Sequence, residues 1–262
     1  MTRVRYETDR GVAVLTLADP PANAYSYEMM QELDQAVLRA RMDEDVHVIV
    51  LTGDGEKFFC AGADIATLQT VTPEFKDYFC LHANETLCRL EQTPKLVIAA
   101  LNGHCVGGGF EVAMACDLRI AREGGGRLGL PEVALGVLPG TGGTQRLVRL
   151  VGRSKALRLM IEGSNMLFAE ALAQGLVDRT MPGDRAAFLA SVLEYARGFA
   201  PPEKASRAVG RIKRAVTTGA EMSFTDALSF ERELQQQLFM GEDAKEGMAA
   251  FSAKRKAAFK GR

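Results

Sequence analysis

A run of three glycines stands between a buried-type apolar segment and the start of an apolar helical pattern. The segment Leu96–Leu101 leads to Gly107–Gly109, and residues 112–116 continue with helical spacing. Glycines leave backbone N–H groups uncovered at a helix start, where the amides are unpaired and the helix dipole is positive. This position therefore suits a developing negative charge, and Glu111 adds a carboxylate within one turn of the same donors.

The same glycines also have a purely structural interpretation. Glycines after a strand often serve a tight turn or close helix packing, and a glutamate in the first helical turn is favourable without any catalytic role. The spacing of Gly107–Gly109 is not the G-x-G-x-x-G of a dinucleotide site. This segment alone leaves a packing role and a chemical role open.

Composition excludes several classes of protein. The chain has 262 residues, of which 47% are hydrophobic and 25% charged, and its net charge is -1. It is therefore long enough for one large domain, or for one domain with an appendage, and has no electrostatic footprint for nucleic acid or a membrane surface. No apolar run reaches the length of a membrane span, and residues 1–7 predict a strand rather than a signal sequence. We expect a cytoplasmic protein.

Cysteine and histidine usage gives no sign of a disulfide framework or a metal site. The five cysteines are odd in number and form no C-x-x-C pair, and the three histidines are scattered. His104 lies close to the glycines, which leaves a polar role open, but a turn or packing role is the simpler expectation.

The first half of the chain alternates strands with helices. Apolar runs predict strands at residues 12–17, 46–53, 96–101 and 118–121, and helices are predicted after Ser26 and through residues 75–87. This alternation predicts an α/β fold with covered sheets. Helical patterns dominate from residue 144.

Pro201-Pro202 marks a boundary in the second half. We therefore expect a core over residues 1–200 and a helical C-terminal region over residues 201–262. The apolar residues of this region need a partner, which could be the core of the same chain or a neighbouring subunit. They are Phe224, Leu228, Leu234, Leu238, Met248, Phe251 and Phe259.

Two further segments have residues suited to chemistry. Phe58–Ile65 is rich in small residues that would let a ligand approach the backbone, although in isolation a tightly packed loop is the favoured interpretation. Glu132 lies in the mostly apolar stretch 128–138, where a carboxylate must be paired, raised in pKa or used. The glycine-rich run after Pro139 lacks the ending of a nucleotide P-loop, and no G-x-S-x-G elbow occurs.

Taken together and in this order, these segments resemble the enoyl-CoA hydratase/isomerase (crotonase) superfamily, and most of all an enoyl-CoA hydratase. The motifs that carry the resemblance are Phe59–Ile65, Asn102–Glu111, Pro131-Glu132, Pro139–Leu147 and Phe251–Lys256. The resemblance spans nearly the whole chain. It implies a spiral of ββα units followed by a helical oligomerisation region, assembled as a homotrimer or as a homohexamer of paired trimers.

The resemblance also implies roles for individual residues. The amides of Ala63 and Gly108 would form the oxyanion hole for the thioester carbonyl of a coenzyme A substrate. Glu111 would activate the water that attacks Cβ, and Glu132 would deliver or remove the proton at Cα. Because many relatives with other chemistries lack one of these acids, the presence of both favours hydration of a 2-enoyl-CoA. No cofactor is expected beyond the coenzyme A of the substrate.

Further residues are implied in substrate binding. The strip Ala61, Ala63, Asp64, Ile65 and Ala66, together with Gly108, would bind the adenine and pantetheine parts through backbone groups. Lys57 and Lys254 are candidate phosphate partners, the latter from an adjacent subunit, and each is equally well explained as a solvated surface lysine.

Some features depart from the familiar hydratases of this family. Phe110 stands where a smaller residue is common, and the spacing from Glu111 to Glu132 is one residue longer, absorbed in Gly124–Gly126. The expected loop Thr67–Phe79, which would line the acyl end, varies in the family. An enoyl-CoA isomerase, which needs only one acid/base group, stays as the alternative function, as does a non-catalytic or RNA-associated member.

Overall fold

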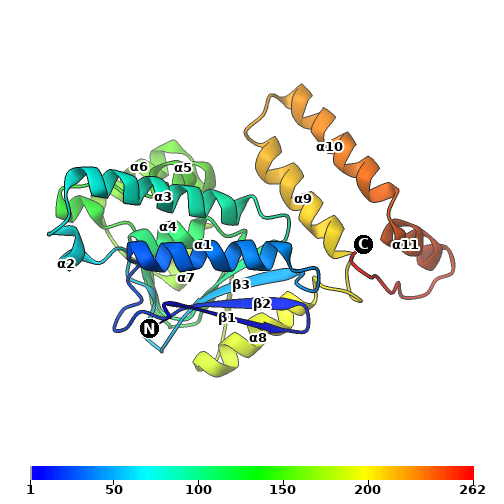
Figure 1. Ribbon diagram of the computed structural model, residues 1–262, viewed down its shortest axis with the longest axis horizontal. Coiled ribbons are helices and arrows are strands. Elements are labelled where there is room, and N and C mark those ends of the chain that lie inside the picture. Colours follow the sequence, from blue (N-terminus) through cyan, green and yellow to red (C-terminus); the bar gives the residue numbers. More distant parts are fainter. Residues whose placement is uncertain (1) are drawn as a thin grey trace.

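Two sheets form the body of the molecule, and the computed structural model describes residues 2–262 (Figure 1). The larger sheet has the order β1-β2-β3-β5-β7-β10, with β1 antiparallel to β2 and all other neighbours parallel. Its strands are β1 (Val4–Asp9), β2 (Val12–Leu17), β3 (Val48–Gly53), β5 (Leu96–Leu101), β7 (Leu118–Arg122) and β10 (Arg179–Met181).

The smaller sheet contains only short strands, in the order β4-β6-β8-β9. Strands β4, β6 and β8 are parallel, and β9 runs antiparallel to β8. These strands are β4 (Phe58–Cys60), β6 (His104–Val106), β8 (Arg127–Gly129) and β9 (Met166–Leu167). Because β4 and β6 lie side by side, the chain segments that follow them emerge next to each other.

The core lies on both faces of the larger sheet. Strands β2, β3 and β5 are buried along their whole length, which accounts for their unbroken apolar runs, because parallel strands are covered on both faces. Helices α1 (Tyr27–Met42) and α3 (Pro73–Glu91) lie on one face, and α8 (Arg185–Arg197) lies on the other (Figure 1). The α/β class with covered parallel sheets is confirmed.

The remaining helices are mostly short until the C-terminal end. They are α2 (Ile65–Leu68), α4 (Gly108–Met114), the 3-10 helix η1 (Glu132–Leu135), α5 (Gly143–Val151), α6 (Arg153–Glu162), α7 (Phe168–Ala173), α9 (Ser206–Gly219), α10 (Phe224–Phe239) and α11 (Glu242–Ser252). Helix α9 begins just after the predicted boundary at residue 201. Helices α9, α10 and α11 extend away from the sheets (Figure 1).

A buried ion pair attaches α9 to the core. Lys213 Nζ lies 2.9 Å from Asp117 Oδ2 and donates to Lys95 O at 3.1 Å, and both charged side chains are largely shielded from solvent. Gly210 is needed at this contact, because a β-carbon there would lie 2.0 Å from Pro94 O.

Several apolar side chains on α9 and on the helices after it are exposed. They include Ile212, Val216, Phe224, Phe239 and Phe251.

Local expectations were partly correct. Ser26 caps α1 and accepts a hydrogen bond from Met29 N, as predicted. The predicted helix through residues 75–87 is confirmed by α3. The expected loop Thr67–Phe79 is therefore too long at its C-terminal end, because Thr72 caps α3 and Pro73 occupies its first turn, where a missing N–H costs nothing. Phe259 was also misplaced, since it follows α11 rather than continuing a helix.

Candidate active site

Glu111 is a buried carboxylate held by three donors. It lies in the first turn of α4, and only 2% of its surface is exposed. Its Oε1 accepts hydrogen bonds from Thr141 N at 2.8 Å and from Gly143 N at 2.7 Å, and its Oε2 accepts from the Thr141 hydroxyl. A buried carboxylate needs such partners, because its desolvation is otherwise costly.

The glycine-rich segment before α5 is shaped to receive this carboxylate. A β-carbon at Gly143 would lie 2.8 Å from Glu111 Oε1 and 2.8 Å from Pro139 Cβ, so only glycine lets the two segments come this close. Gly142 adopts a positive φ of 99°, which turns the chain into α5. The run that resembled the family therefore forms the wall that holds Glu111.

Glu132 lies in the same site, but it is more exposed than Glu111 and has fewer hydrogen-bond partners. It begins the short helix η1, is partly exposed, and its Oε2 is buried without a hydrogen-bond partner among residues 2–262. A β-carbon at Gly107 would lie 3.0 Å from its Oε1, which places the carboxyl beside the start of α4. Burial raises the pKa of Glu132 to about 7, and the nearby charge of Glu111 adds to this increase.

The apolar neighbours of Glu132 do not bury it in the way the sequence suggested. Val133, Leu135, Val137 and Leu138 are between 48% and 67% exposed. Of the three outcomes expected for this carboxylate (paired, raised in pKa or used), the raised pKa is the one observed, and it comes from burial by other parts of the fold. These side chains instead leave an apolar surface next to the carboxyl group.

The amides of Ala63 and Gly108 lie on adjacent segments. Ala63 follows β4 and Gly108 follows β6, and a β-carbon at Gly62 would lie 3.0 Å from Gly108 N. Gly108 is the first residue of α4, so its N–H has no acceptor within the helix. Within residues 2–262, neither of these two N–H groups donates a hydrogen bond to the chain. Two free amides therefore occur where two parallel strands end.

The rest of the strip lies at the start of α2. Ala61 is half-buried, whereas Ile65 and Ala66 are exposed. Asp64 caps α2, because its side chain accepts hydrogen bonds from Ala66 N at 3.1 Å and Thr67 N at 3.3 Å. The Asp64 carboxylate thus has a structural role that its sequence pattern did not indicate.

The two candidate phosphate lysines lie far apart. Lys57 is exposed just before β4, with Nζ 5.3 Å from the centroid of the Phe58 ring. Lys254 follows α11, and Figure 1 shows α11 at the opposite end of the molecule from α2. A single chain therefore brings together the strip, the two amides and the two glutamates, but not Lys254.

Other sequence candidates have structural roles or lie in the core. His104 lies in β6, and its Nδ1 accepts a hydrogen bond from Arg127 N at 3.2 Å, which matches the packing role expected for it. Phe110 is 1% exposed and belongs to the hydrophobic core. Tyr25 and Thr141 were not singled out from the sequence, yet both are buried beside Glu111. Thr141 lies within the motif Pro139–Leu147 but was given no role of its own, and Tyr25 lies outside every motif, because their contact joins residues 116 positions apart.

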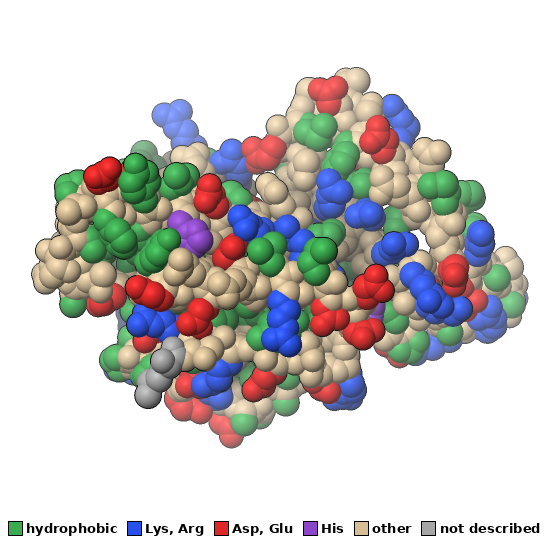
Figure 2. Space-filling model, viewed as in Figure 1, with side chains coloured by type: hydrophobic (Ala, Val, Ile, Leu, Met, Phe, Trp, Pro, Cys, Tyr) green, Lys and Arg blue, Asp and Glu red, His purple; other side chains and the backbone are tan. Residues whose placement is uncertain are grey.

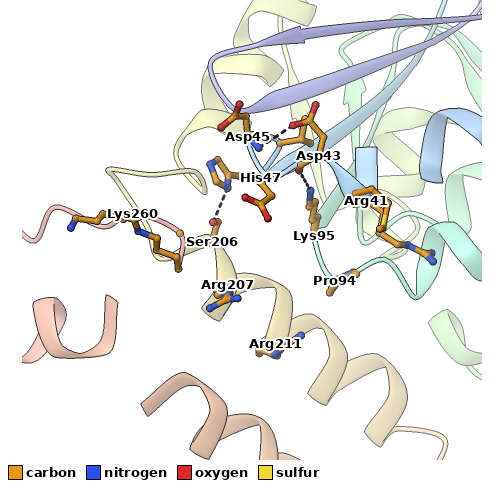
Figure 3. A pocket seen from close by; sticks show the side chains of 15 residues that line it. Arg41, Asp43, Asp45, His47, Pro94, Lys95, Ser206, Arg207, Arg211 and Lys260 are labelled. Atoms are coloured by element: carbon orange, nitrogen blue, oxygen red, sulfur yellow. Dashed lines mark hydrogen bonds between the residues drawn. The ribbon is translucent and has the colours of Figure 1, made fainter. Parts of the chain in front are cut away.

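A charged pocket of about 480 Å³ lies elsewhere, between the core and α9 (Figure 3). His47 Nδ1 and Ser206 Oγ form a hydrogen bond of 3.0 Å across it, and the backbone N–H of Asp45 donates to Asp43 Oδ1. The pocket shares no lining residue with the glutamate site. The His47–Ser206 bond attaches α9 to the core, which gives these polar groups a structural role, so the glutamate site is the better candidate for catalysis.

Three further observations concern the described residues as a whole. Hydrophobic side chains gather over α3 on the left of the face in Figure 2, where Phe75, Tyr78 and Leu81 are exposed. In the described part of the chain, no helix is both long and apolar enough to cross a membrane. Nor do residues 2–262 gather three metal-ligating side chains in one place.

Comparison with known proteins shows the family to which the chain belongs. The family model described as enoyl-CoA hydratase/isomerase matches residues 7–262. A probable enoyl-CoA hydratase from Rhizobium meliloti (strain 1021) is 44% identical over 98% of this chain and 97% of that protein. A short-chain-enoyl-CoA hydratase from Clostridium acetobutylicum is 39% identical, with 98% of this chain and 97% of that protein covered.

Solved structures show the same relationship. An enoyl-CoA hydratase from Geobacillus kaustophilus HTA426 superposes with a TM-score of 0.96 at 45% sequence identity, and the match covers 100% of this chain and 98% of that chain. The chain therefore belongs to the enoyl-CoA hydratase/isomerase family and has the crotonase fold.

Proposed function

We propose that this protein is an enoyl-CoA hydratase, a hydro-lyase that adds water across the 2,3 double bond of a 2-enoyl-CoA to give a 3-hydroxyacyl-CoA. The observation that carries the proposal is that Glu111 and Glu132 lie in one site but in different surroundings. Glu111 has its donors fixed, whereas Glu132 has a buried, unpartnered oxygen and a pKa of about 7. A hydratase needs one group that accepts a proton from water and one group that donates a proton to carbon.

In this mechanism the two glutamates act on opposite ends of the double bond. Glu111 accepts a proton from water while the water oxygen bonds to Cβ, and Glu132 delivers a proton to Cα. A carboxyl with a pKa of about 7 still holds its proton in a large fraction of molecules near neutral pH, as a proton donor requires. The reverse reaction uses the same groups with their protonation states exchanged.

The amides of Ala63 and Gly108 would stabilise the enolate-like oxygen formed between these steps. Fixed N–H donors cost no reorganisation when the charge develops, and losing one typically costs about 10²–10³-fold in rate. Their support is geometric, since both N–H groups are unpaired within the described residues and lie on adjacent segments.

The strip from Ala61 to Ala66 would bind the coenzyme A part of the thioester, with Lys57 near its phosphates and Lys254 contributed by another copy of the chain. The reaction needs no cofactor beyond that coenzyme A. We also propose assembly as a homotrimer or homohexamer, because Ile212, Val216 and Phe251 expose 62%, 65% and 87% of their surface. Light scattering of the purified protein at several concentrations tests this assembly.

The nearest alternative is an enoyl-CoA isomerase, which would use the same amides but only one acid/base group. A non-catalytic or RNA-associated role fits less well, because the net charge is -1 and a basic face would be expected. The two enzyme functions differ in product, since only the hydratase incorporates oxygen from water.

A panel of short, long, branched and carboxylated trans-2-enoyl-CoA thioesters tests the proposal. We expect loss of the conjugated thioester absorbance and the appearance of a 3-hydroxyacyl-CoA with at least one of them. Absence of hydration across the panel, with conversion of a 3-enoyl-CoA to its 2-enoyl isomer, would refute the hydratase and support the isomerase. Measurable RNA binding without either reaction would support the third alternative.

A further inference from the structure

Tyr25 connects three segments of the candidate site. It precedes α1, is 4% exposed, and its N–H donates to Gly62 O at 2.9 Å, next to the Ala63 amide. Its ring fills the space beside Gly108, because a β-carbon there would lie 2.2 Å from Tyr25 Cε1 and 2.4 Å from its hydroxyl oxygen. Tyr25 thus touches the segments of both oxyanion-hole amides.

The phenol group reaches further, to the segment that holds Glu111. Tyr25 Oη lies 3.2 Å from Thr141 Oγ1, and the Thr141 hydroxyl in turn bonds to Glu111 Oε2. A carboxylate only accepts hydrogen bonds and a hydroxyl has one proton to donate. In the proposed function Glu111 acts as a carboxylate, so the Thr141 proton points to it and Tyr25 donates to Thr141.

Tyr25 is well suited to remain a donor. Burial, and then the charge of Glu111, raise the pKa of Tyr25 well above its ordinary value. The phenol therefore keeps its proton across the pH range in which the enzyme would work. A chain of two hydroxyl groups then runs in one direction and ends on one carboxylate oxygen.

We propose that Tyr25, acting through Thr141, is a positioning residue for Glu111. The hydroxyl groups of Tyr25 and Thr141 occupy one side of Glu111 Oε2 and fix the plane of the Glu111 carboxylate. The remaining electron pair of Oε2 is then aligned with the attacking water. This role rests on the proposed hydratase function. A merely structural Tyr25 would affect stability through the packing of its ring, and its hydroxyl would not matter for turnover.

Tyr25→Phe tests this role because it removes only the hydroxyl. We expect kcat for hydration of a short trans-2-enoyl-CoA to fall about 3- to 10-fold, the effect of one neutral hydrogen bond, with KM changed less than about twofold. Thr141→Ala should lower kcat more, about 10- to 100-fold, because it also removes a donor to a charged group. Tyr6→Phe is the matched control, since it deletes a phenol hydroxyl on β1 that has no partner among the described residues.

The double variant Tyr25→Phe/Thr141→Ala shows whether Tyr25 acts on Glu111 through Thr141, which we call the relay, or independently of it. If Tyr25 acts only through Thr141, Tyr25→Phe should have no further effect in the Thr141→Ala background. Thr141→Ser, which keeps the hydroxyl, should restore most of the rate. Thermal unfolding of every variant checks that each one folds.

Two results would overturn the relay while the wild type still hydrates its substrate. One is an unchanged kcat in Tyr25→Phe, and the other is an equal loss from Tyr25→Phe in the presence and absence of the Thr141 hydroxyl. Failure of the proposed function looks different. In that case the wild type would exchange the Cα hydrogen of a saturated acyl-CoA with solvent but hydrate none of the thioesters, which would overturn both proposals.

Discussion

The two glutamates of the site lie on segments of opposite character. Glu111 is in a helix that starts inside the core, and the backbone amides of Thr141 and Gly143 fix its carboxylate. Glu132 is on a one-turn 3-10 helix with exposed apolar neighbours and an unpartnered oxygen. In the proposed function, one residue type therefore acts as a fixed proton acceptor or as a donor with a raised pKa, depending on which segment carries it.

The largest expected effect comes from removing the fixed acceptor. Glu111→Gln should lower kcat for hydration about 10³-fold, within the range of general base catalysis, with a small change in KM, because the amide cannot accept a proton from water. Steady-state kinetics with a short trans-2-enoyl-CoA measure this. Glu194→Gln on the exposed side of α8 is the control. Turnover that survives Glu111→Gln would remove water activation from this residue.

A smaller effect should follow from moving the same carboxylate without removing it. Gly143→Ala places a methyl group 2.8 Å from Glu111 Oε1, so the carboxylate must shift, and we expect kcat to fall about 10²-fold. Gly219→Ala is the matched control, because its methyl group would meet its nearest neighbour, Ala227 Cβ, at 3.6 Å. Equal activity of the two variants would show that the position of Glu111 is not tightly required.

The raised pKa of Glu132 predicts a pH dependence. Hydration needs Glu132 protonated, so kcat/KM should fall about tenfold per pH unit above its pKa of about 7. In Glu132→Gln the remaining activity should lack this alkaline decrease, because the amide does not titrate. A decrease of the same midpoint in both proteins would assign it to another group.

The smallest effect concerns folding. Folding raises the pKa of Glu132 from 4.5 to about 7, so the folded protein binds this proton more tightly than the unfolded chain does. The resulting contribution to the free energy of unfolding is complete below pH 4.5 and is lost as the pH rises through 7. Because the side chain is partly exposed, we expect only about 1 kcal/mol after solvent screening. Urea unfolding of the wild type and Glu132→Gln at pH 5 and pH 8 measures it. A wild type that gains stability relative to the variant at pH 8 would contradict the raised pKa.

The sequence predicted the parts of the molecule that repeat a local rule. Strands β2, β3 and β5 were found because parallel strands buried on both faces read as unbroken apolar runs. The start of α4 was found because glycines and a glutamate mark a helix terminus with free amides. Both glutamates were named from their surroundings in the chain, and the structure brings them together.

The parts that were missed depend on contacts between distant segments. Strands β8 and β9 are three and two residues long, too short for any period to be visible. Tyr25 and Thr141 meet across 116 positions, so neither has a neighbour in sequence that announces its role. The unpartnered Oε2 of Glu132 likewise depends on which distant segments pack around the carboxyl group, as Gly107 does beside the other oxygen, Oε1.

Glu111 is proposed to activate water and Glu132 to transfer the proton at Cα. The most direct test of these separate roles is hydrogen exchange at Cα in the absence of hydration. A short saturated acyl-CoA is incubated in D2O with the wild type, Glu111→Gln or Glu132→Gln, and deuterium at Cα is followed by mass spectrometry. Exchange needs the free amides and Glu132 but no attacking water. We predict that Glu111→Gln exchanges at close to the wild-type rate and that Glu132→Gln does not exchange. Exchange that is retained in Glu132→Gln, or lost equally in both variants, would contradict the separate roles.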